Sequence, residues 1–227
     1  SLQLIFIVRF ACTKVKLSDP ENVLETSASR STTKYQSWES IGKKIAEYSI
    51  NNFVVLTICN KGMAIEWLQQ WYVSARRSGI ENLVVIATDE EAYYWIRERI
   101  GERAISAQGL IPLLRADRWN NSDNTTEQNF AYNWRSMGYE RVVTQRATIL
   151  SAILKNTEVN IIYSDTDIHW MKNPIEVVRK YSKYNVCFQR EKGDELGDYN
   201  CTGVMFLMNT RLTYIFVKAW ELYIQKR

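Results

Sequence analysis

Two acidic residues in the second half of the chain, Asp165 and Asp167, have a spacing that could support chemistry. They directly follow residues 160–164, a short apolar run of the kind that forms a buried strand. In extended backbone, residues two apart face the same way, so we expect both carboxylates to point into one space. Like charges this close repel each other unless a cation lies between them. A divalent cation that prefers oxygen ligands, Mn²⁺ or Mg²⁺, fills that role, so the pair is a candidate metal site.

The elements that must position the pair alternate along the chain. Short β-branched runs predict strands, and apolar residues that recur every three to four positions predict helices. Gly79 and Gly101 stand where glycines that end helices are expected, and Asn173-Pro174 is a helix start. The predicted strands are 53–58, 83–87, 160–164, 186–188 and 204–208, and the predicted helices are 65–75, 90–100, 143–154, one from 173 and one from 212 to the end.

This alternation predicts an α/β fold with a mostly parallel central sheet flanked by helices. In open sheets of this kind, ligands bind at the carboxyl ends of the strands, which is where the acidic pair falls. The alternative is that Asp165 and Asp167 are two surface acids that flank Thr166 and cap the next turn. The position in the predicted sheet favours the metal site.

Three segments lie outside the alternating pattern. Residues 12–40 are polar and rich in Ser and Thr, and residues 106–135 form a long irregular connection. Residues 2–8 are apolar but far shorter than a membrane span, so they are either the tail of an anchor or signal peptide, or a buried strand. We therefore divide the chain into an N-terminal stem or linker, 1–45, and a main domain, 46–227, which stops within a helix.

Composition excludes some classes of function. A net charge of +4 without a Lys/Arg block gives no sign of a nucleic-acid partner. The four cysteines are too scattered for a disulfide framework, and no CxxC pair suggests zinc. Formal N-glycosylation acceptors at Asn120, Asn124 and Asn200 favour the secretory pathway.

The segment around the acidic pair resembles a known family. Residues 162–174 read IYSDTDIHWMKNP, which is similar to the signature of the nucleotide-diphospho-sugar transferase family. That family includes plant rhamnogalacturonan xylosyltransferases and arabinosyltransferases that act on extensin-type substrates. The resemblance covers about residues 50–220, and residues 57–62, 82–89 and 200–205 agree with it in order and spacing.

The resemblance implies a GT-A fold and a glycosyltransferase that uses a nucleotide-sugar donor, a UDP-sugar, with Mn²⁺ or Mg²⁺ and with retention of anomeric configuration. The partner it implies is a glycan or glycoprotein acceptor. It also implies a Golgi-lumenal, type II membrane protein that meets the membrane only through an N-terminal anchor. Asp165 and Asp167 would be the metal ligands, and the donor-binding candidates are Thr57, Asn60, Asp89, Arg146 and Asp165.

Several residues keep two interpretations. Asp89 either touches the nucleotide or caps the helix that starts at Glu90. His169 is the single histidine, whereas GT-A enzymes usually add a histidine near the C-terminus as a third metal ligand. His169 either approaches the ion or packs elsewhere. For the catalytic group beside the sugar, the candidates are Asp165, Asp167, Gln189, Asp194 and, less directly, Asp198, and the last three are also ordinary loop residues.

Two other functions compete with a glycosyltransferase. A non-catalytic descendant would bind nucleotide or glycan without turnover, which an incomplete metal shell favours. A Mg²⁺-dependent phosphohydrolase also places Asp-x-Asp after a strand, but there it is the first strand, whereas here the pair comes late. A calcium loop is excluded because Trp170 stands where that loop requires glycine.

Overall fold

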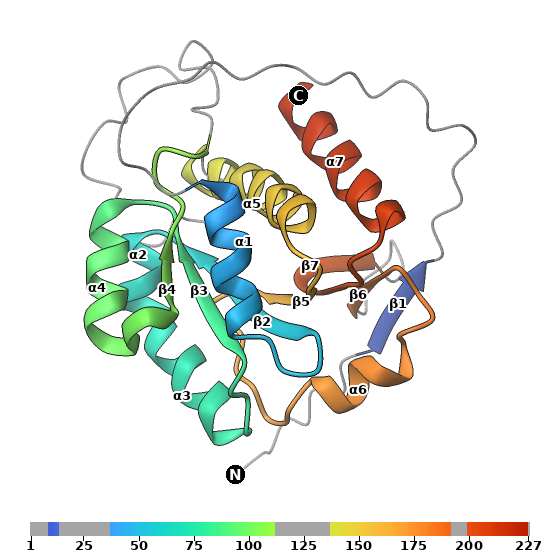
Figure 1. Ribbon diagram of the computed structural model, residues 1–227, viewed down its shortest axis with the longest axis horizontal. Helices are drawn as coiled ribbons and strands as arrows, with labels where there is room; N and C mark the ends of the chain where they lie inside the picture. The colour runs from blue at the N-terminus through green and yellow to red at the C-terminus, as the bar shows by residue number, and fades with distance from the viewer. Residues whose placement is uncertain (1–8, 14–36, 112–136, 192–198, 227) are drawn as a thin grey trace.

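The computed structural model describes residues 9–13, 37–111, 137–191 and 199–226. These residues form one layer of strands between two layers of helices (Figure 1). Within them the sheet has seven strands, in the order β1-β6-β7-β5-β2-β3-β4. The strands are β1 (Arg9–Thr13), β2 (Phe53–Cys59), β3 (Leu83–Ala87), β4 (Ala104–Ser106), β5 (Asn160–Ser164), β6 (Val186–Glu191) and β7 (Tyr199–Leu207).

Most strands of the sheet point in one direction. Strand β2 pairs in parallel with β3 and β5, and β3 pairs in parallel with β4. Strand β7 is antiparallel to both β5 and β6, and β1 is antiparallel to β6. Strands β2 to β6 therefore share one direction, and β1 and β7 run against it. This arrangement confirms the predicted α/β fold with a mostly parallel sheet, as in a GT-A fold.

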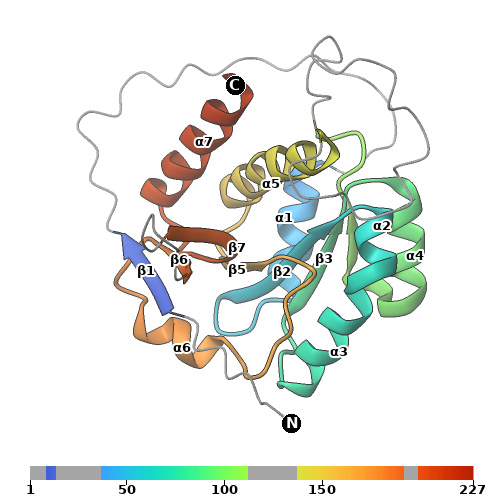
Figure 2. The same cartoon turned by 180° about the vertical axis from the view of Figure 1, so that it is seen from behind.

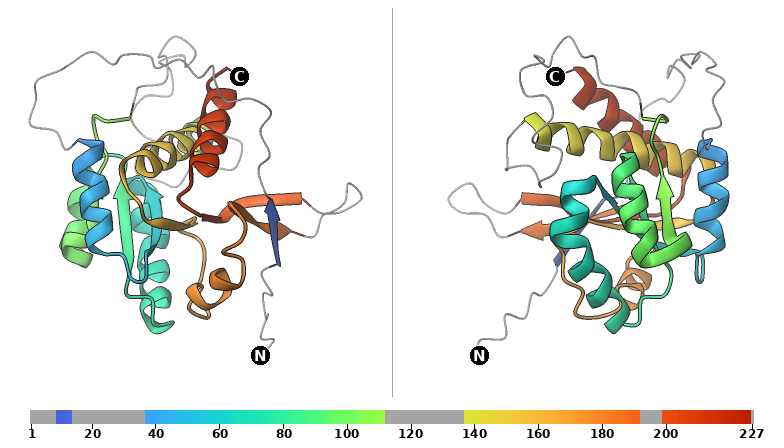
Figure 3. Two further views of the ribbon diagram at one scale, coloured as in Figure 1. Left: turned by 45° about the vertical axis from the view of Figure 1, so that its right-hand side comes forward. Right: turned by 90° about the vertical axis from the view of Figure 1, so that its left-hand side faces the viewer.

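Helices cover both faces of the sheet (Figures 1 and 2). On one face, residues of three helices share a core with the strands, and α5 and α7 pack against each other (Figure 3). These helices are α1 (Trp38–Glu47), α5 (Met137–Asn156) and α7 (Arg211–Lys226). The opposite face carries α2 (Lys61–Met63), a π-helical turn (Ala64–Leu68), α3 (Gln69–Arg77), α4 (Glu90–Ile100), which continues into a 3-10 turn (Gly101–Arg103), and α6 (Ile175–Lys180).

The central strands are buried on both faces, as their continuous apolar sequence predicts. In β2, alternate residues serve the two cores: Val54 and Leu56 contact the side of α1, α5 and α7, and Val55 and Cys59 contact the side of α3 and α4. Each fully buried Val, Leu or Ile contributes roughly 1.5–3 kcal/mol relative to an exposed position. The paired cores hold β2 and β5 in register, and so fix where these strands end.

Helix α1 approaches α5 closely because it carries a glycine at the contact. A Cβ atom built on Gly42 would lie 2.0 Å from the backbone oxygen of Asn156, a distance that backbone atoms do not tolerate. On either side of this contact, Ile41 and Ile45 are buried in the core. The Ser37 hydroxyl accepts a hydrogen bond from Ser40 N and caps the helix.

The N-terminal part of the chain contributes more to the described fold than we expected. Strand β1 pairs with β6, and α1 begins at Trp38, within the segment interpreted as linker. Both elements are short, and polar residues surround their few apolar positions, so sequence patterns did not reveal them. The other segments assigned to the stem, 1–8 and 14–36, lie outside the described residues, as do 112–136 with the sequons at Asn120 and Asn124.

The cysteines include a disulfide that their spacing did not suggest. Cys187 on β6 is disulfide-bonded, whereas Cys59 and Cys201 are reduced cysteines. The residue directly opposite Cys187 across the β1–β6 pair is Cys12. Within the described residues, no helix is both long enough and apolar enough to cross a membrane.

Candidate active site

The acidic pair lies where β5 ends, at the edge of the sheet. Strand β5 ends at Ser164, and Asp165 is the next residue, with its backbone N–H donating to the carbonyl of Gly203 at 2.8 Å. The chain then turns at Thr166 and Asp167, and Ile168 N–H donates back to the Asp165 carbonyl at 3.4 Å. The backbone is therefore not extended through the pair, contrary to the geometry that we expected. Asp165 is partly buried and Asp167 is exposed.

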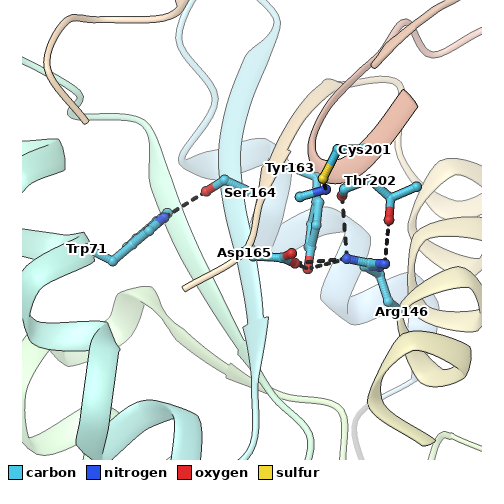
Figure 4. Close-up of polar contacts among 8 residues, drawn as sticks. Trp71, Arg146, Tyr163, Ser164, Asp165, Cys201 and Thr202 are labelled. Carbon is cyan, nitrogen blue, oxygen red and sulfur yellow. Dashed lines mark hydrogen bonds and ion pairs between the residues drawn. The ribbon is translucent and has the colours of Figure 1, made fainter. Parts of the chain in front are cut away.

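One oxygen of Asp165 is held by two neighbours (Figure 4). Arg146 Nη1 donates to Asp165 Oδ1 at 2.8 Å, and the hydroxyl of Tyr163 donates to the same oxygen at 2.5 Å. Arg146 comes from α5, and its Nη2 donates to Thr202 Oγ1 on β7 at 2.7 Å. The guanidinium therefore joins a helix, β5 and β7 around a single carboxylate oxygen.

The charges of this network act on one another. Burial raises the pKa of the Asp165 carboxyl, whereas the positive charge of Arg146 and the hydrogen bond from Tyr163 lower it. The negative charge of Asp167 raises this pKa as well, so the two carboxylates lie close enough to interact. Burial, followed by the charge of Asp165, raises the pKa of Tyr163 well above its ordinary value. The Tyr163 hydroxyl therefore keeps its proton and acts as a donor at neutral pH.

The second oxygen of Asp165 faces a glycine. A Cβ atom built on Gly203 would lie 3.2 Å from Asp165 Oδ2 and 3.3 Å from the sulfur of Cys201. Glycine thus lets β7 come close to the carboxylate without crowding it. Among the described residues, no hydrogen bond reaches Oδ2, in contrast to the two that reach Oδ1.

Four polar contacts fasten the acidic loop to α3 and to the turn that follows it. Trp71 Nε1 donates to Ser164 Oγ at 2.7 Å, just before the pair (Figure 4). After the pair, Trp170 N donates to Ser74 Oγ at 3.1 Å, and Ser78 Oγ donates to the Trp170 carbonyl at 2.8 Å. Asn173 Nδ2 then donates to the Gly79 carbonyl at 3.0 Å. The loop that carries both aspartates is therefore held at each end.

These contacts explain several residues of the sequence signature. Ser164 and Trp170 are buried, and Asn173 Oδ1 accepts from Ile175 N at 3.0 Å. Asn173 thus contacts the first residue of α6, although the N-cap is Pro174 and not Asn173 as expected. These contacts hold the loop in position. Trp71 and Ser74 were not predicted, because they are more than 90 residues away in the chain and no local pattern connects them to the loop.

The donor-binding candidates on β2 and β3 follow strand ends at the same edge. Strands β5, β2 and β3 are parallel neighbours, so their carboxyl ends lie at the same edge of the sheet. The residues that follow these ends are Asp165, Asn60 and Asp89. Asn60 Oδ1 accepts from Met63 N at 2.9 Å and caps α2. Thr57 is fully buried, and its hydroxyl has no hydrogen-bond partner among the described residues.

Asp89 serves two backbone groups at once. Its Oδ1 accepts from Ala92 N at 2.7 Å and caps α4, and its Oδ2 accepts from Lys61 N at 3.0 Å. The side chain therefore ties the start of α4 to the turn after β2. Asp89 therefore has the capping role that was one of its two predicted interpretations. In addition, it binds the backbone of the turn that follows β2.

The remaining candidates lie in different places. Gln189 is on β6 rather than in a loop, and it faces Cys201 across the β6–β7 pair, beside a bulge. Asp194 and Asp198 lie outside the described residues. His169 is exposed on the loop after Asp167. Within the described parts of the chain, no three Asp, Glu, His or Cys side chains gather as a metal site, so the acidic pair has no third ligand of these types there.

Comparison with known families identifies the class of protein. The model of the nucleotide-diphospho-sugar transferase family matches residues 78–227, about two thirds of the chain, so the chain belongs to this family of glycosyltransferases. This agrees with the resemblance seen in the segment around Asp165.

A search of curated proteins gives a more particular relative. The chain is similar to the beta-arabinofuranosyltransferase RAY1 of Arabidopsis thaliana, with 24% identity over 155 residues, which is 67% of this chain. The aligned part covers 24% of that relative, so the chain spans about a quarter of its length. No solved structure matches the chain.

Proposed function

We propose that this chain carries the donor site of a glycosyltransferase that moves a sugar from a UDP-sugar to a glycan or glycoprotein acceptor. The cofactor in this proposal is Mn²⁺ or Mg²⁺, and the reaction retains anomeric configuration. The observation that carries the proposal is the position of Asp165, which follows the end of β5 beside Asp167, at the edge that Asn60 and Asp89 also reach. Ligands of α/β sheets bind at this edge.

The donor set of the acidic pair suits a divalent cation that prefers oxygen. The described structure leaves Oδ2 of Asp165 and the exposed carboxylate of Asp167 for a ligand, and the buried hydroxyl of Thr166 between them has no hydrogen-bond partner there. Mg²⁺ is commonly bound through one or two carboxylates together with the phosphates of a substrate. A bound ion supplies Lewis-acid stabilisation of the charge that develops on the leaving diphosphate.

The residues of this chain supply the rest of the arrangement. The contacts between α3 and the loop hold Asp165 and Asp167 at the sheet edge, so little reordering is needed when the donor binds. Asn60 and Asp89 fix the turns after β2 and β3, and we propose that the nucleotide lies along these turns. The hydroxyl of Thr57, for which the described parts of the chain offer no hydrogen-bond partner, lies in the strand that leads into this region.

We keep Gln189 as the candidate for contact with the transferred sugar. It lies on β6, paired with β7, and β7 carries Thr202 and Gly203 beside Asp165. Its amide offers both a donor and an acceptor to sugar hydroxyls. Asp194 lies outside the described residues and stays a prediction from the sequence.

We also propose a Golgi-lumenal, type II membrane protein with an N-terminal anchor. Cys187 is disulfide-bonded, and disulfides persist in the oxidising compartments of the secretory pathway. The three sequons support the same route.

A second candidate function is a non-catalytic relative that binds nucleotide or glycan. It is favoured by the two-carboxylate shell, to which the described residues add no third Asp, Glu, His or Cys ligand. The family match does not support the phosphohydrolase alternative.

The test is to incubate the purified chain with UDP-arabinofuranose, UDP-xylose and UDP-galactose, with and without Mn²⁺, and to measure released UDP. Metal-dependent release of UDP from one of these sugars is the result that we expect. UDP binding without release at any Mn²⁺ concentration would instead support the non-catalytic relative. Glu98→Gln, an exposed acid on α4, is the matched control for loss of a carboxylate.

A further inference from the structure

We propose that Arg146 and Tyr163 are positioning residues that reserve Oδ2 of Asp165 for the cation, and that Arg146 does not bind the donor itself. This inference rests on the proposed function, because it concerns the same acidic pair. It departs from the assignment of Arg146 as a donor-binding residue.

The first step is that Arg146 is directed inward. Its side chain is 6% exposed, and its terminal nitrogens donate to Asp165, Thr202 and the hydroxyl of Tyr163. A buried guanidinium needs a carboxylate close by, because a buried charge without a partner is strongly destabilising. The guanidinium of Arg146 therefore binds Asp165 from the protein interior, where a ligand from solvent would not reach it.

The second step is that both positioning residues donate hydrogen bonds to the same oxygen of Asp165. Arg146 Nη1 and the Tyr163 hydroxyl both donate to Oδ1, at 2.8 Å and 2.5 Å. These two hydrogen bonds fix the orientation of the carboxylate, and Oδ2 then points toward Gly203 of β7. Oδ2 is therefore the oxygen of Asp165 that would hold a cation, and the two hydrogen bonds to Oδ1 fix its direction in advance.

The third step concerns charge. Asp165 and Asp167 are like charges two residues apart, and Arg146 pairs with Asp165 at 2.8 Å and so opposes their repulsion. Arg146 therefore lets the two acids coexist without an ion.

The experiment measures Mn²⁺ affinity by water-proton relaxation, with and without UDP, in the full chain. The variants are Tyr163→Phe, Arg146→Gln and Arg146→Lys, and Tyr94→Phe and Arg76→Gln are matched exposed controls. Partners that orient a metal ligand typically change metal affinity by about 10- to 100-fold when they are removed. We expect losses of that size for Tyr163→Phe and Arg146→Gln in the presence of UDP, a smaller loss for Arg146→Lys, and metal-free UDP affinity within about twofold of the wild type.

Each other outcome overturns a stated part. If the wild type does not bind Mn²⁺ in the presence of UDP, the proposed metal site and the positioning role both fail. If the wild type binds Mn²⁺ and Tyr163→Phe binds it equally well, the positioning role alone fails. If Arg146→Gln weakens metal-free UDP binding while Mn²⁺ affinity is unchanged, Arg146 contacts the donor directly. Tyr163→Phe removes only a hydroxyl, so it keeps the test decisive should Arg146→Gln fail to fold.

Discussion

The indole N–H of Trp71 donates to the hydroxyl oxygen of Ser164 at 2.7 Å, and both side chains are buried. This contact links α3 to the last residue of β5, directly before Asp165 (Figure 4). The position of the acidic pair therefore depends on a helix that precedes it by more than 90 residues.

Trp71→Phe tests this link, because it keeps most of the ring and removes the donor. The buried hydroxyl of Ser164 then loses its partner, which typically costs about 1–3 kcal/mol. We expect the free energy of unfolding, measured by urea denaturation, to fall by that amount. Trp95→Phe, on α4 and away from the loop, is the matched control. Equal stability of the two variants would contradict the link.

Gly203→Ala tests the close approach of β7 to Asp165. The added Cβ would lie 3.2 Å from Oδ2, and two hydrogen bonds to Oδ1 prevent the carboxylate from moving away freely. We expect Mn²⁺ affinity in the presence of UDP to fall about tenfold, by analogy with loss of a group that orients a ligand. Thermal unfolding, measured in parallel, separates this effect from a general loss of stability. Unchanged Mn²⁺ affinity would show that the carboxylate tolerates the added methyl group.

Gly42→Ala tests the packing of α1 on α5. The new Cβ would lie 2.0 Å from the carbonyl oxygen of Asn156, so one helix must shift. Overpacking of this kind typically costs about 1–3 kcal/mol and sometimes more, and a backbone neighbour places Gly42 at the upper end. Lys43→Ala, whose side chain is 73% exposed, should change the free energy of unfolding by less than about 0.5 kcal/mol. A small effect at both positions would mean that α1 packs differently.

Cys187→Ala tests the disulfide of β6. Loss of a native disulfide typically costs about 2–5 kcal/mol, so we expect a lower midpoint in urea, and the same shift in the wild type after reduction. Cys201→Ala, which removes a thiol outside the disulfide, is the control. Peptide mapping without reductant should find Cys187 joined to Cys12, its register partner on β1. A free Cys187 in the purified protein would contradict this prediction.

Periodic apolar patterns were sufficient to predict most of the fold. Helix α4 agrees with the predicted limits, and β2, β3 and β5 agree within a residue, because each is a long or fully buried run bounded by turn residues. Strands β1 and β4 and helix α1 were missed. A short edge strand such as β1, or a helix that buries only one stripe, leaves few apolar residues for a pattern to detect.

The site was predictable only in part. The acidic pair could be found from its spacing, because both residues belong to one short segment. The orientation of Asp165 could not, because it depends on Arg146 and Thr202, which come from α5 and β7. The extended geometry assumed for the pair was wrong for a local reason, since the chain turns at Thr166 and Asp167 as soon as β5 ends.

The central claim is that Asp167 and Oδ2 of Asp165 hold the cation that binds the donor's diphosphate. Asp167→Asn is the cleanest variant, because Asp167 is exposed, whereas a change at Asp165 would also disturb the buried Arg146. The measurement is UDP affinity by calorimetry as a function of Mn²⁺. We predict that Mn²⁺ strengthens UDP binding in the wild type and in Glu98→Gln, and that Asp167→Asn loses this dependence while metal-free affinity is unchanged. The same Mn²⁺ dependence in Asp167→Asn as in the wild type would contradict the claim.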